Sequence, residues 1–173
     1  MNEWKPLLPF GDSTLIETVV TTALEVCRDV VLVVGYRGEE LAGLFDSDSR
    51  VKIVRNPKWE EGMLSSILAG LDRIEAPRFF IVPADMPYLT AEVYRALMTA
   101  TPEDVVVPVH RGRRGHPVLI DSGLIDAIFT AGRHKGSMRE VLQGENFGHV
   151  TWEDDSVLRD LDTPEDYRRG GEA

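Results

Sequence analysis

A single carboxylate stands between two prolines in the segment VPADMPYLT, residues 82–90. Pro83 ends the apolar run before it, because proline has no N–H to give to the ladder of a sheet. Pro87 keeps the next helix from starting early, so the two prolines predict a rigid turn around Asp85. A fixed carboxylate suits a hard cation such as Mg²⁺, which takes one or two carboxylates together with phosphate oxygens. The alternative is a turn aspartate that caps the helix beginning at Ala91.

A second pair of carboxylates occurs near the carboxyl end, in the segment RDLDTPEDY, residues 159–167. Asp160 and Asp162 are two positions apart, which puts both side chains on one face of an extended segment. Either could complete a cation site with Asp85. Alternatively, Asp162 precedes Thr-Pro-Glu and would cap a last helix that opens at Thr163.

The segment EEGMLSSILAGL, residues 60–71, offers polar groups at the start of a helix. Gly62 lets a ligand approach the backbone closely. Free N–H groups of the first helical turn and the hydroxyls of Ser65 and Ser66 could read the edge of a base. An ordinary helix start is the alternative.

Two loops concentrate positive charge in this acidic chain. HRGRRGHPV, residues 110–118, holds three arginines and two histidines and predicts a local anion site. An exposed hairpin tip is the alternative, and a histidine such as His116 is more often a structural hydrogen-bonding group. GRHKGSMRE, residues 132–140, opens a helix whose N-terminus could hold phosphate, or it is a solvated turn. Lys5 precedes the first helix and by itself indicates only a surface lysine.

The elements that must position these groups alternate between helix and strand. Such an order indicates βαβ units and a mostly parallel sheet, in which ligands bind beyond the carboxyl ends of the strands. Gly35, Asn56, Asp85 and the loop after Val109 are then the candidate positions. We predict helices at 15–27, 39–45, 63–74, 91–100, 124–130, 138–143 and from Thr163, strands at 30–34, 51–55, 79–82, 105–109 and 117–120, and extended segments at 147–152 and 157–161.

Length and composition limit the classes of protein to which this chain can belong. The chain has 173 residues, of which 43% are apolar, enough for one domain spanning residues 1–173. A net charge of −10 argues against binding to a nucleic acid polymer. The single Cys27 excludes an internal disulfide framework and a cysteine zinc site. Without a signal peptide or a long apolar run, we expect a soluble cytoplasmic protein that does not bind membranes.

Taken in order, these segments resemble the MobA-like nucleotidyltransferases, and among them the molybdenum cofactor cytidylyltransferase branch. The match covers nearly the whole chain. KPLLPFGDSTLIE is similar to the family's lysine loop and first helix, NPKWEEGMLSSILAGL to its base-reading segment, VPADMPYL to its Asp-x-Pro metal motif, RRGHPVLI to its acceptor loop and RDLDTPEDY to its closing acidic motif.

The resemblance implies a three-layer α/β/α sandwich with a mostly parallel, Rossmann-like sheet, as in the nucleotide-diphospho-sugar transferases. It implies an enzyme that transfers a nucleoside monophosphate to a phosphorylated acceptor and releases pyrophosphate. The expected donor is CTP rather than GTP, and the expected acceptor is molybdopterin, made for a molybdoenzyme. A cytidylyltransferase for a sugar or polyol phosphate is a related alternative.

The resemblance also assigns roles to residues. It implies Mg²⁺ held by Asp85 and by Asp162 or Asp160, with Lys5, Asp85 and Asp162 as the catalytic residues. Lys5 would neutralise triphosphate charge. The remaining assignments are Gly62, Met63, Ser65 and Ser66 to the base, Gly115 and His116 to the acceptor, and Arg111, Arg113 and Arg114 to acceptor phosphate.

One part of the family pattern is missing. The family's first strand and its loop Leu-Ala-Ala-Gly-x-Ser-x-Arg-Met-Gly-x-x-Lys precede the lysine, whereas this sequence opens with MNEWK. We expect a start codon assigned at an internal methionine, or else a natural loss that leaves a nucleotide- or molybdoenzyme-binding protein without turnover. The sheet would lack a strand beside residues 30–34. We expect residues 1–8 or a partner's strand to fill this place, and a closed-up sheet is the third outcome.

Overall fold

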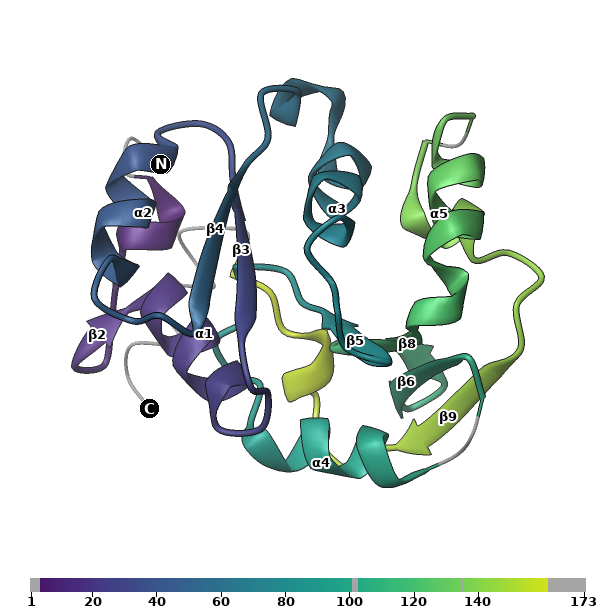
Figure 1. Ribbon diagram of the computed structural model, residues 1–173. Coiled ribbons are helices and arrows are strands. Elements are labelled where there is room, and N and C mark those ends of the chain that lie inside the picture. The colour runs from purple at the N-terminus through teal and green to yellow at the C-terminus, as the bar shows by residue number, and fades with distance from the viewer. Residues whose placement is uncertain (1–3, 101–102, 135, 162–173) are drawn as a thin grey trace.

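The computed structural model describes residues 4–100, 103–134 and 136–161 and has the α/β fold that the sequence predicts (Figure 1). The helices are α1 Leu15–Leu24, α2 Gly38–Phe45, α3 Met63–Leu71, α4 Ala91–Ala100, α5 Ile125–Gly132 and α6 Met138–Val141. The strands are β1 Pro9–Phe10, β2 Ser13–Thr14, β3 Val30–Val34, β4 Val51–Arg55, β5 Arg78–Ile81, β6 Val105–His110, β7 Arg113–Arg114, β8 Val118–Asp121 and β9 Phe147–Thr151. None of the helices in these ranges has the length and apolar character needed to cross a membrane.

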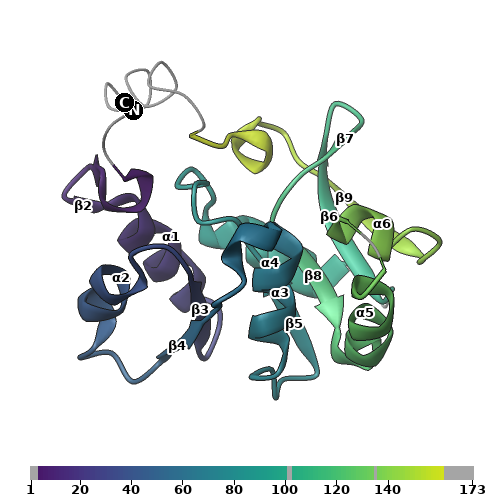
Figure 2. The same ribbon diagram turned by 90° about the horizontal axis from the view of Figure 1, so that it is seen from above.

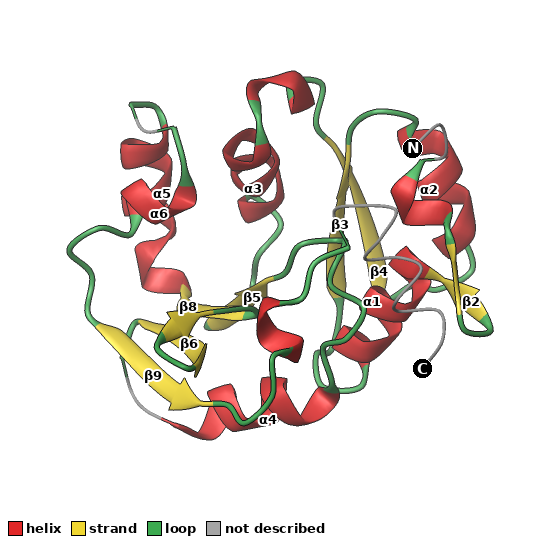
Figure 3. Cartoon of the chain, turned by 180° about the vertical axis from the view of Figure 1, so that it is seen from behind, coloured by secondary structure: helices red, strands yellow, loops and turns green. Residues whose placement is uncertain are grey.

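The helices cover the sheets from two sides, as a three-layer sandwich requires. Along β6, Val106 packs into a cluster with residues of α4, including Tyr94. The neighbouring Val105 and Val107 pack into a different cluster that contains Ile128 of α5. This alternation follows from the pleat of a strand, which sends successive side chains to opposite faces. Figure 3 shows α4 on one side of β6, β8 and β9 and α5 on the other.

The strands form two main groups rather than one continuous sheet. β3 and β4 pair in parallel, in register from Val30–Val51 to Val34–Arg55. The second sheet has the order β5-β8-β6-β7, and β9 pairs with β6 in parallel. β8 runs antiparallel to both β5 and β6, because the short connection through β7 cannot return to the starting edge of β6. The second sheet is therefore mixed.

A gap separates the two groups of strands where the missing strand was expected. No hydrogen-bonded pairing joins β3 to β5 in the described residues, and a cavity of about 2210 Å³ lies between them. The sheet has not closed up. The prediction that residues 1–8 fill the gap is wrong for residues 4–8, since Lys5–Leu7 forms a 3₁₀ turn and Trp4 and Leu7 pack against a cluster around Ile16. Pro6 also lacks the N–H that a paired strand needs.

Other local differences have simple causes. The segment predicted as extended at 157–161 begins with a 3₁₀ turn at Ser156–Leu158, where the N–H of Ser156 donates to Oδ1 of Asp154. Such a short-range bond competes with extended structure. The β1–β2 hairpin was not predicted, and Gly11 at its turn has a φ of 58°. The helix predicted from Thr163 lies outside the described residues.

Candidate functional site

Asp85 lies in the turn between β5 and α4, beyond the carboxyl end of β5. The turn is anchored by Met86 and Leu89, which are buried in the cluster beneath α4. Thr90 immediately precedes α4, so the capping position belongs to Thr90 and Asp85 is too far from the helix to cap it. The carboxylate of Asp85 is partly exposed and lines the cavity between β3 and β5.

Two other segments meet the Asp85 turn. The N–H of Leu161 donates to the backbone oxygen of Asp85 over 2.9 Å, and the N–H of His116 donates to the backbone oxygen of Val157 over 2.8 Å. Gly115 packs so tightly here that a Cβ would lie 2.2 Å from the oxygen of Val157. These contacts fix residues 157–161 against both loops and bring the exposed Asp160 to the same place.

The His116 ring lies where these segments meet. Burial lowers the pKa of His116, while a hydrogen bond with the backbone of Ile81 and the charges of Asp85 and Asp160 act in the opposite direction. Its Nδ1 atom is buried and has no hydrogen-bond partner among the described residues. The ring is therefore held neutral beside two carboxylates. The hydrogen bond to Ile81 also supports the structural role that sequence analysis weighed for this histidine.

Asp85 and Asp160 are the carboxylates near the turn that could hold a metal. Among the described residues, no group of three or more His, Cys, Asp or Glu side chains is arranged to bind an ion. Two carboxylates fit Mg²⁺, because this ion is commonly completed by substrate phosphates and water. They do not fit a structural zinc site, which needs four nitrogen or sulfur ligands. Asp162 lies outside the described residues.

Asn56 organises the segment predicted to face a base. Asn56 is 3% exposed, and its Nδ2 donates to the hydroxyl of Ser65 over 2.8 Å and to that of Ser66 over 2.9 Å. Its Oδ1 accepts from the N–H of Lys58 over 2.9 Å. The sequence indicated Asn56 only as the end of a strand, and this role was not predicted. An asparagine that follows a strand and precedes a proline is a signal for such a turn.

The two serines differ in what remains available to a ligand. The Ser65 hydroxyl donates within the loop, to the backbone oxygens of Lys58 and Gly62. Ser66 accepts from Asn56, and its side chain lines the cavity, as does that of the exposed Met63. Gly62 precedes α3 with a φ of 96°, which other residues rarely adopt. Ser66 is thus better placed than Ser65 to contact a bound molecule.

The basic loop at 110–118 is partly the hairpin tip that sequence analysis weighed. Arg111 and Gly112 have positive φ values of 48° and 78° and form the turn between β6 and β7. Arg113 is exposed. The Arg114 guanidinium lies over the ring of Phe147, 3.9 Å from its centroid, and Nε donates to Nε2 of His149 over 3.1 Å.

The second basic loop does not offer the phosphate site considered above. Ser137 and Glu140 form a capping box at the start of α6. The Glu140 carboxylate accepts from the N–H groups of Gly136 and Ser137 over 2.9 and 3.0 Å. A carboxylate already occupies the place that a phosphate would take, so the solvated-turn alternative holds.

Several of the predicted site residues line one cavity. Lys5, in the 3₁₀ turn Lys5–Leu7, lines it together with Met63, Ser66, Asp85, Gly115 and His116. Arg113 and Arg114 also contribute to its lining, whereas Gly62, Ser65 and Asp160 lie outside it. Figure 2 shows the amino-terminal turn, the 156–158 turn and the β6–β7 hairpin along one side of the molecule. Residues from four separate parts of the sequence thus line one cavity.

Comparison with known proteins identifies the family. The family model described as the MobA-like NTP transferase domain matches residues 1–150. The chain belongs to the MobA-like NTP transferase family. The molybdenum cofactor cytidylyltransferase of Escherichia coli K12 is 29% identical over 167 residues, covering 96% of this chain and 86% of that protein. The nicotine blue oxidoreductase of Paenarthrobacter nicotinovorans is 29% identical over 177 residues, covering 95% and 86%.

Solved structures confirm the fold of this MobA-like chain. The crystal structure of Rv0371c from Mycobacterium tuberculosis H37Rv superposes with a TM-score of 0.82 at 19% identity, covering 100% of this chain and 92% of that chain. A structure of the same protein described as a complex with manganese gives a TM-score of 0.78, covering 98% and 91%. At such identity the likeness is one of fold.

Proposed function

We propose that this MobA-like chain is a Mg²⁺-dependent nucleotidyltransferase that transfers CMP from CTP to the terminal phosphate of a molybdopterin-type acceptor. One observation carries the proposal: the Asp85 turn, the His116 loop and the Asp160 segment meet beside a cavity that Lys5 and Ser66 also line. The names of relatives support the chemistry, since the Escherichia coli protein is a molybdenum cofactor cytidylyltransferase. The manganese complex of Rv0371c supports a divalent cation.

In this reaction an acceptor phosphate oxygen attacks the α-phosphorus of the nucleotide, and the bond to pyrophosphate breaks. Such a step depends on positioning and charge neutralisation more than on covalent chemistry. Asp85 would hold the cation, with Asp160 or Asp162 as the second carboxylate. Mg²⁺, when bound, supplies positive charge to the phosphate oxygens. Lys5 would add a further positive charge on the triphosphate.

The Asn56 network would orient the base. Because Asn56 is buried and fixes both serine hydroxyls, the Ser66 O–H keeps a defined position at the cavity wall. The N–H groups at the start of α3 and the Gly62 backbone lie next to it. Such fixed donors discriminate well between bases. A base without an acceptor at the matching position would leave a buried donor without a hydrogen bond, which costs binding free energy.

The acceptor would enter beside β7 and the His116 loop. Arg113 is exposed at this hairpin, and Gly115 and His116 line the cavity next to it. Neutral His116 belongs to this loop and is within the influence of the Asp85 and Asp160 charges, so it would position an acceptor group without adding a charge. Arg113 would attract the acceptor phosphate.

The test is pyrophosphate release by the 173-residue chain with CTP or GTP, Mg²⁺ and molybdopterin. We expect release that requires all three components, that is faster with CTP, and that falls at least about a hundredfold in Asp85→Asn. Release that persists in Asp85→Asn would refute the metal assignment. Equal rates with CTP and GTP would refute the cytidylyl assignment.

The second candidate is a protein of this fold that binds nucleotide without turnover. The gap between β3 and β5 favours it, because no strand pairing holds the two sides of the cavity together in the described residues. Calorimetric binding of CTP with Mg²⁺, together with no pyrophosphate release at any acceptor concentration, would support this candidate over the enzyme.

A further inference from the structure

A second, smaller cavity lies between the β6–β7 hairpin and residues 155–159, two parts of the chain that Figure 2 shows along the same side of the molecule. Its volume is about 270 Å³, and its lining residues are His110, Arg111, Arg113, Asp155, Leu158 and Arg159. Pockets for drug-sized ligands usually measure about 300–1,000 Å³, so this space suits a small ion. Of these residues, only Arg113 takes part in the function proposed above.

Three guanidinium groups give this small cavity a positive charge. Arg111 and Arg113 come from the hairpin, and Arg159 comes from the other wall. None of the three forms an ion pair with a carboxylate of the described residues. The Arg159 guanidinium lies over the ring of Tyr88, 3.7 Å from its centroid, which limits its motion. Planar guanidinium groups bind oxyanions through several N–H donors at once, so the cavity is suited to an oxyanion.

Two hydrogen-bond acceptors lie among these donors. His110 is 8% exposed, and its Nδ1 lies 3.0 Å from the backbone oxygen of Trp152. A carbonyl oxygen only accepts, so Nδ1 carries the hydrogen, and Nε2 of the neutral ring is an acceptor. The second acceptor is the carboxylate of Asp155, which makes no capping bond to the turn that follows it. A carboxylate repels a fully ionised anion, so its presence favours an anion that carries a hydroxyl group.

Inorganic phosphate matches both kinds of group. Its ionised oxygens accept from the guanidinium groups, and near neutral pH it keeps P–OH groups that donate to an acceptor. Sulfate has no hydrogen to donate. A phosphate monoester has a second pKa of about 6, so at a higher pH it has lost its P–OH as well. A site that contains acceptors rejects an anion without this hydrogen, because the acceptor is then left without a hydrogen bond.

We propose that this small cavity is a binding site for inorganic phosphate. The charges of Arg111, Arg113 and Arg159 hold the ion, and Asp155 and His110 recognise its P–OH groups. The inference does not rest on the proposed function, because neither the nucleotide nor the acceptor takes part in it. Arg113 lines both cavities and is therefore left unchanged in the tests that follow.

The first test is titration calorimetry on the 173-residue chain with inorganic phosphate, sulfate or glycerol phosphate, at equal ionic strength. The measurements are made at about pH 7.5, where the ester is mostly a dianion. We expect saturable binding of phosphate, with a Kd at least about tenfold lower than the Kd of sulfate or of the ester.

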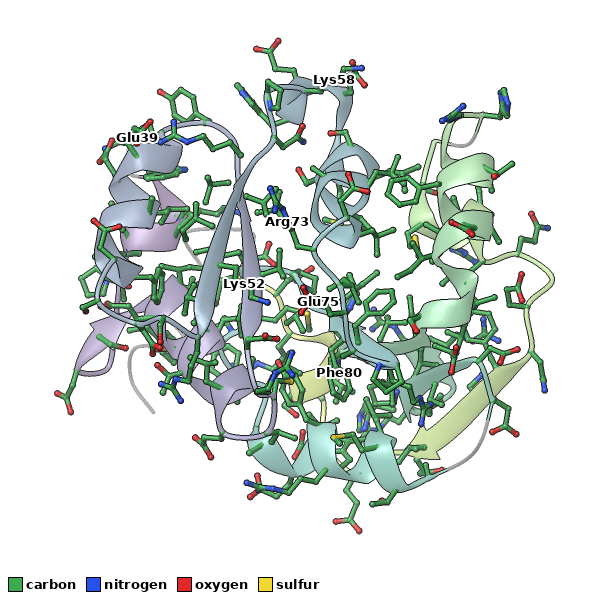
Figure 4. The ribbon with its side chains drawn as sticks, viewed as in Figure 1. Glu39, Lys52, Lys58, Arg73, Glu75 and Phe80 are labelled. Carbon is green, nitrogen blue, oxygen red and sulfur yellow. The ribbon has the colours of Figure 1, made fainter. Side chains whose placement is uncertain are left out.

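Variants of the two walls locate the ion. Arg111→Gln and Arg159→Gln should each raise the Kd of phosphate at least about tenfold, because each removes a charge-assisted hydrogen bond. Lys58→Gln is the control for the loss of one positive charge. Figure 4 shows Lys58 at the tip of the loop before α3, and it is not part of the lining of this cavity. The Tm of each variant shows whether it is folded.

Asp155→Asn tests the selectivity for phosphate. The amide removes the negative charge and supplies N–H donors, so sulfate should bind more tightly and phosphate less tightly. We expect the ratio of the two Kd values to fall below about threefold. Glu153→Gln removes the same charge two positions away and outside the cavity lining, so its ratio should match that of the parent chain.

Four results would overturn the proposal. The first is that phosphate shows no saturable binding. The second is that sulfate or the ester binds as tightly as phosphate, and the third is a ratio that Asp155→Asn leaves unchanged. The fourth is phosphate binding that Asp85→Ala abolishes and Arg159→Gln preserves, which would place the ion in the large cavity.

Discussion

The backbone oxygen of Asp85 accepts a hydrogen bond of 2.9 Å from the N–H of Leu161. This bond ties the turn after β5 to the carboxyl-terminal part of the described chain, and it places Asp160 next to the turn. The sequence motifs around Asp85 and Asp160 are therefore adjacent in the fold, although neither motif alone is specific for one function.

Replacing Asp85 with alanine should separate ligand binding from folding. The side chain is partly exposed and the turn is anchored by Met86 and Leu89, so the free energy of unfolding should change by less than about 1 kcal/mol. Mg²⁺-dependent binding of CTP, measured by calorimetry, should fall below detection. The exposed Asp46, replaced in the same way, is the control. Unchanged CTP affinity in Asp85→Ala would remove this residue from the site.

The Asn56 network predicts different effects for the two serines. Ser66→Ala should weaken CTP binding with little change in stability, because its hydroxyl is at the cavity wall. Ser65→Ala should lower the unfolding free energy by about 1 kcal/mol, because its hydroxyl bonds to two backbone oxygens within the loop. Urea denaturation and calorimetry on both variants give the comparison. The reverse order of effects would contradict the assignment of Ser66 to the ligand.

Asn56→Ala should be more damaging than either serine change. Its amide is buried and makes three hydrogen bonds, so the loss leaves buried polar groups without partners and costs about 1–3 kcal/mol. The same urea experiment measures this cost. If Asn56→Ala lowers the free energy of unfolding no more than Ser65→Ala does, interactions other than the Asn56 hydrogen bonds hold the loop in place.

Stability should depend on pH through His116. Burial lowers the pKa of His116 below its ordinary 6.5, so the unfolded chain takes up a proton at a higher pH than the folded chain does. The neutral His116 ring therefore favours the folded chain fully at a pH above the unfolded pKa. This contribution to the free energy of unfolding is lost as the pH falls through 6.5 toward the folded pKa. Thermal unfolding between about pH 7.5 and pH 5.5 should show a decline in Tm that His116→Gln reduces.

A matched histidine change tests this assignment. His134 is exposed, so His134→Gln should leave the pH dependence of the Tm as it is in the parent chain. The carboxylates with lowered pKa values, such as Glu17, titrate below 4.5 and do not contribute in this range. A slope that survives in His116→Gln would mean that another group causes it.

The two arginines of β7 should respond differently to charge reversal. Arg113→Glu should raise the KM of the acceptor more than that of the nucleotide, with little effect on the Tm, because Arg113 is exposed. Arg114→Glu should also lower the Tm, since it loses the contact with Phe147 and the bond to His149. Equal changes in both KM values would argue against an acceptor role for this hairpin.

The sequence predicted best those elements whose pattern is set by burial. The bounds predicted for β3, β4 and α4 agree with the structure: β3 is a continuous apolar run, β4 ends at Asn56-Pro57, and Ala91 follows a clear turn. Helix ends were less accurate: α1 ends at Leu24, three residues before Cys27. The end of a helix depends on tertiary contacts as well as on local sequence.

The site was predicted only in part, because hydrogen bonds between distant residues leave no local signal. Lys5, Ser66, Asp85 and His116 were named from motifs, and the structure places all four around one cavity. The hydrogen bonds of Asn56 join residues nine and ten positions away, and no periodicity reports them. Residues 157–161 were predicted as extended, whereas Ser156–Leu158 forms a 3₁₀ turn held by the local bond from Ser156 to Asp154.

The close approach of Gly115 to Val157 has a consequence for the order of folding. These residues and the Asp85–Leu161 bond link segments that are far apart in the chain, so the site has a high contact order. Residues 157–161 leave the ribosome long after β5 and the Asp85 turn. The two halves of the proposed cation site therefore meet only after synthesis of the described chain is nearly complete, and any nascent chain arrested before Val157 carries the Asp85 turn without the 157–161 segment.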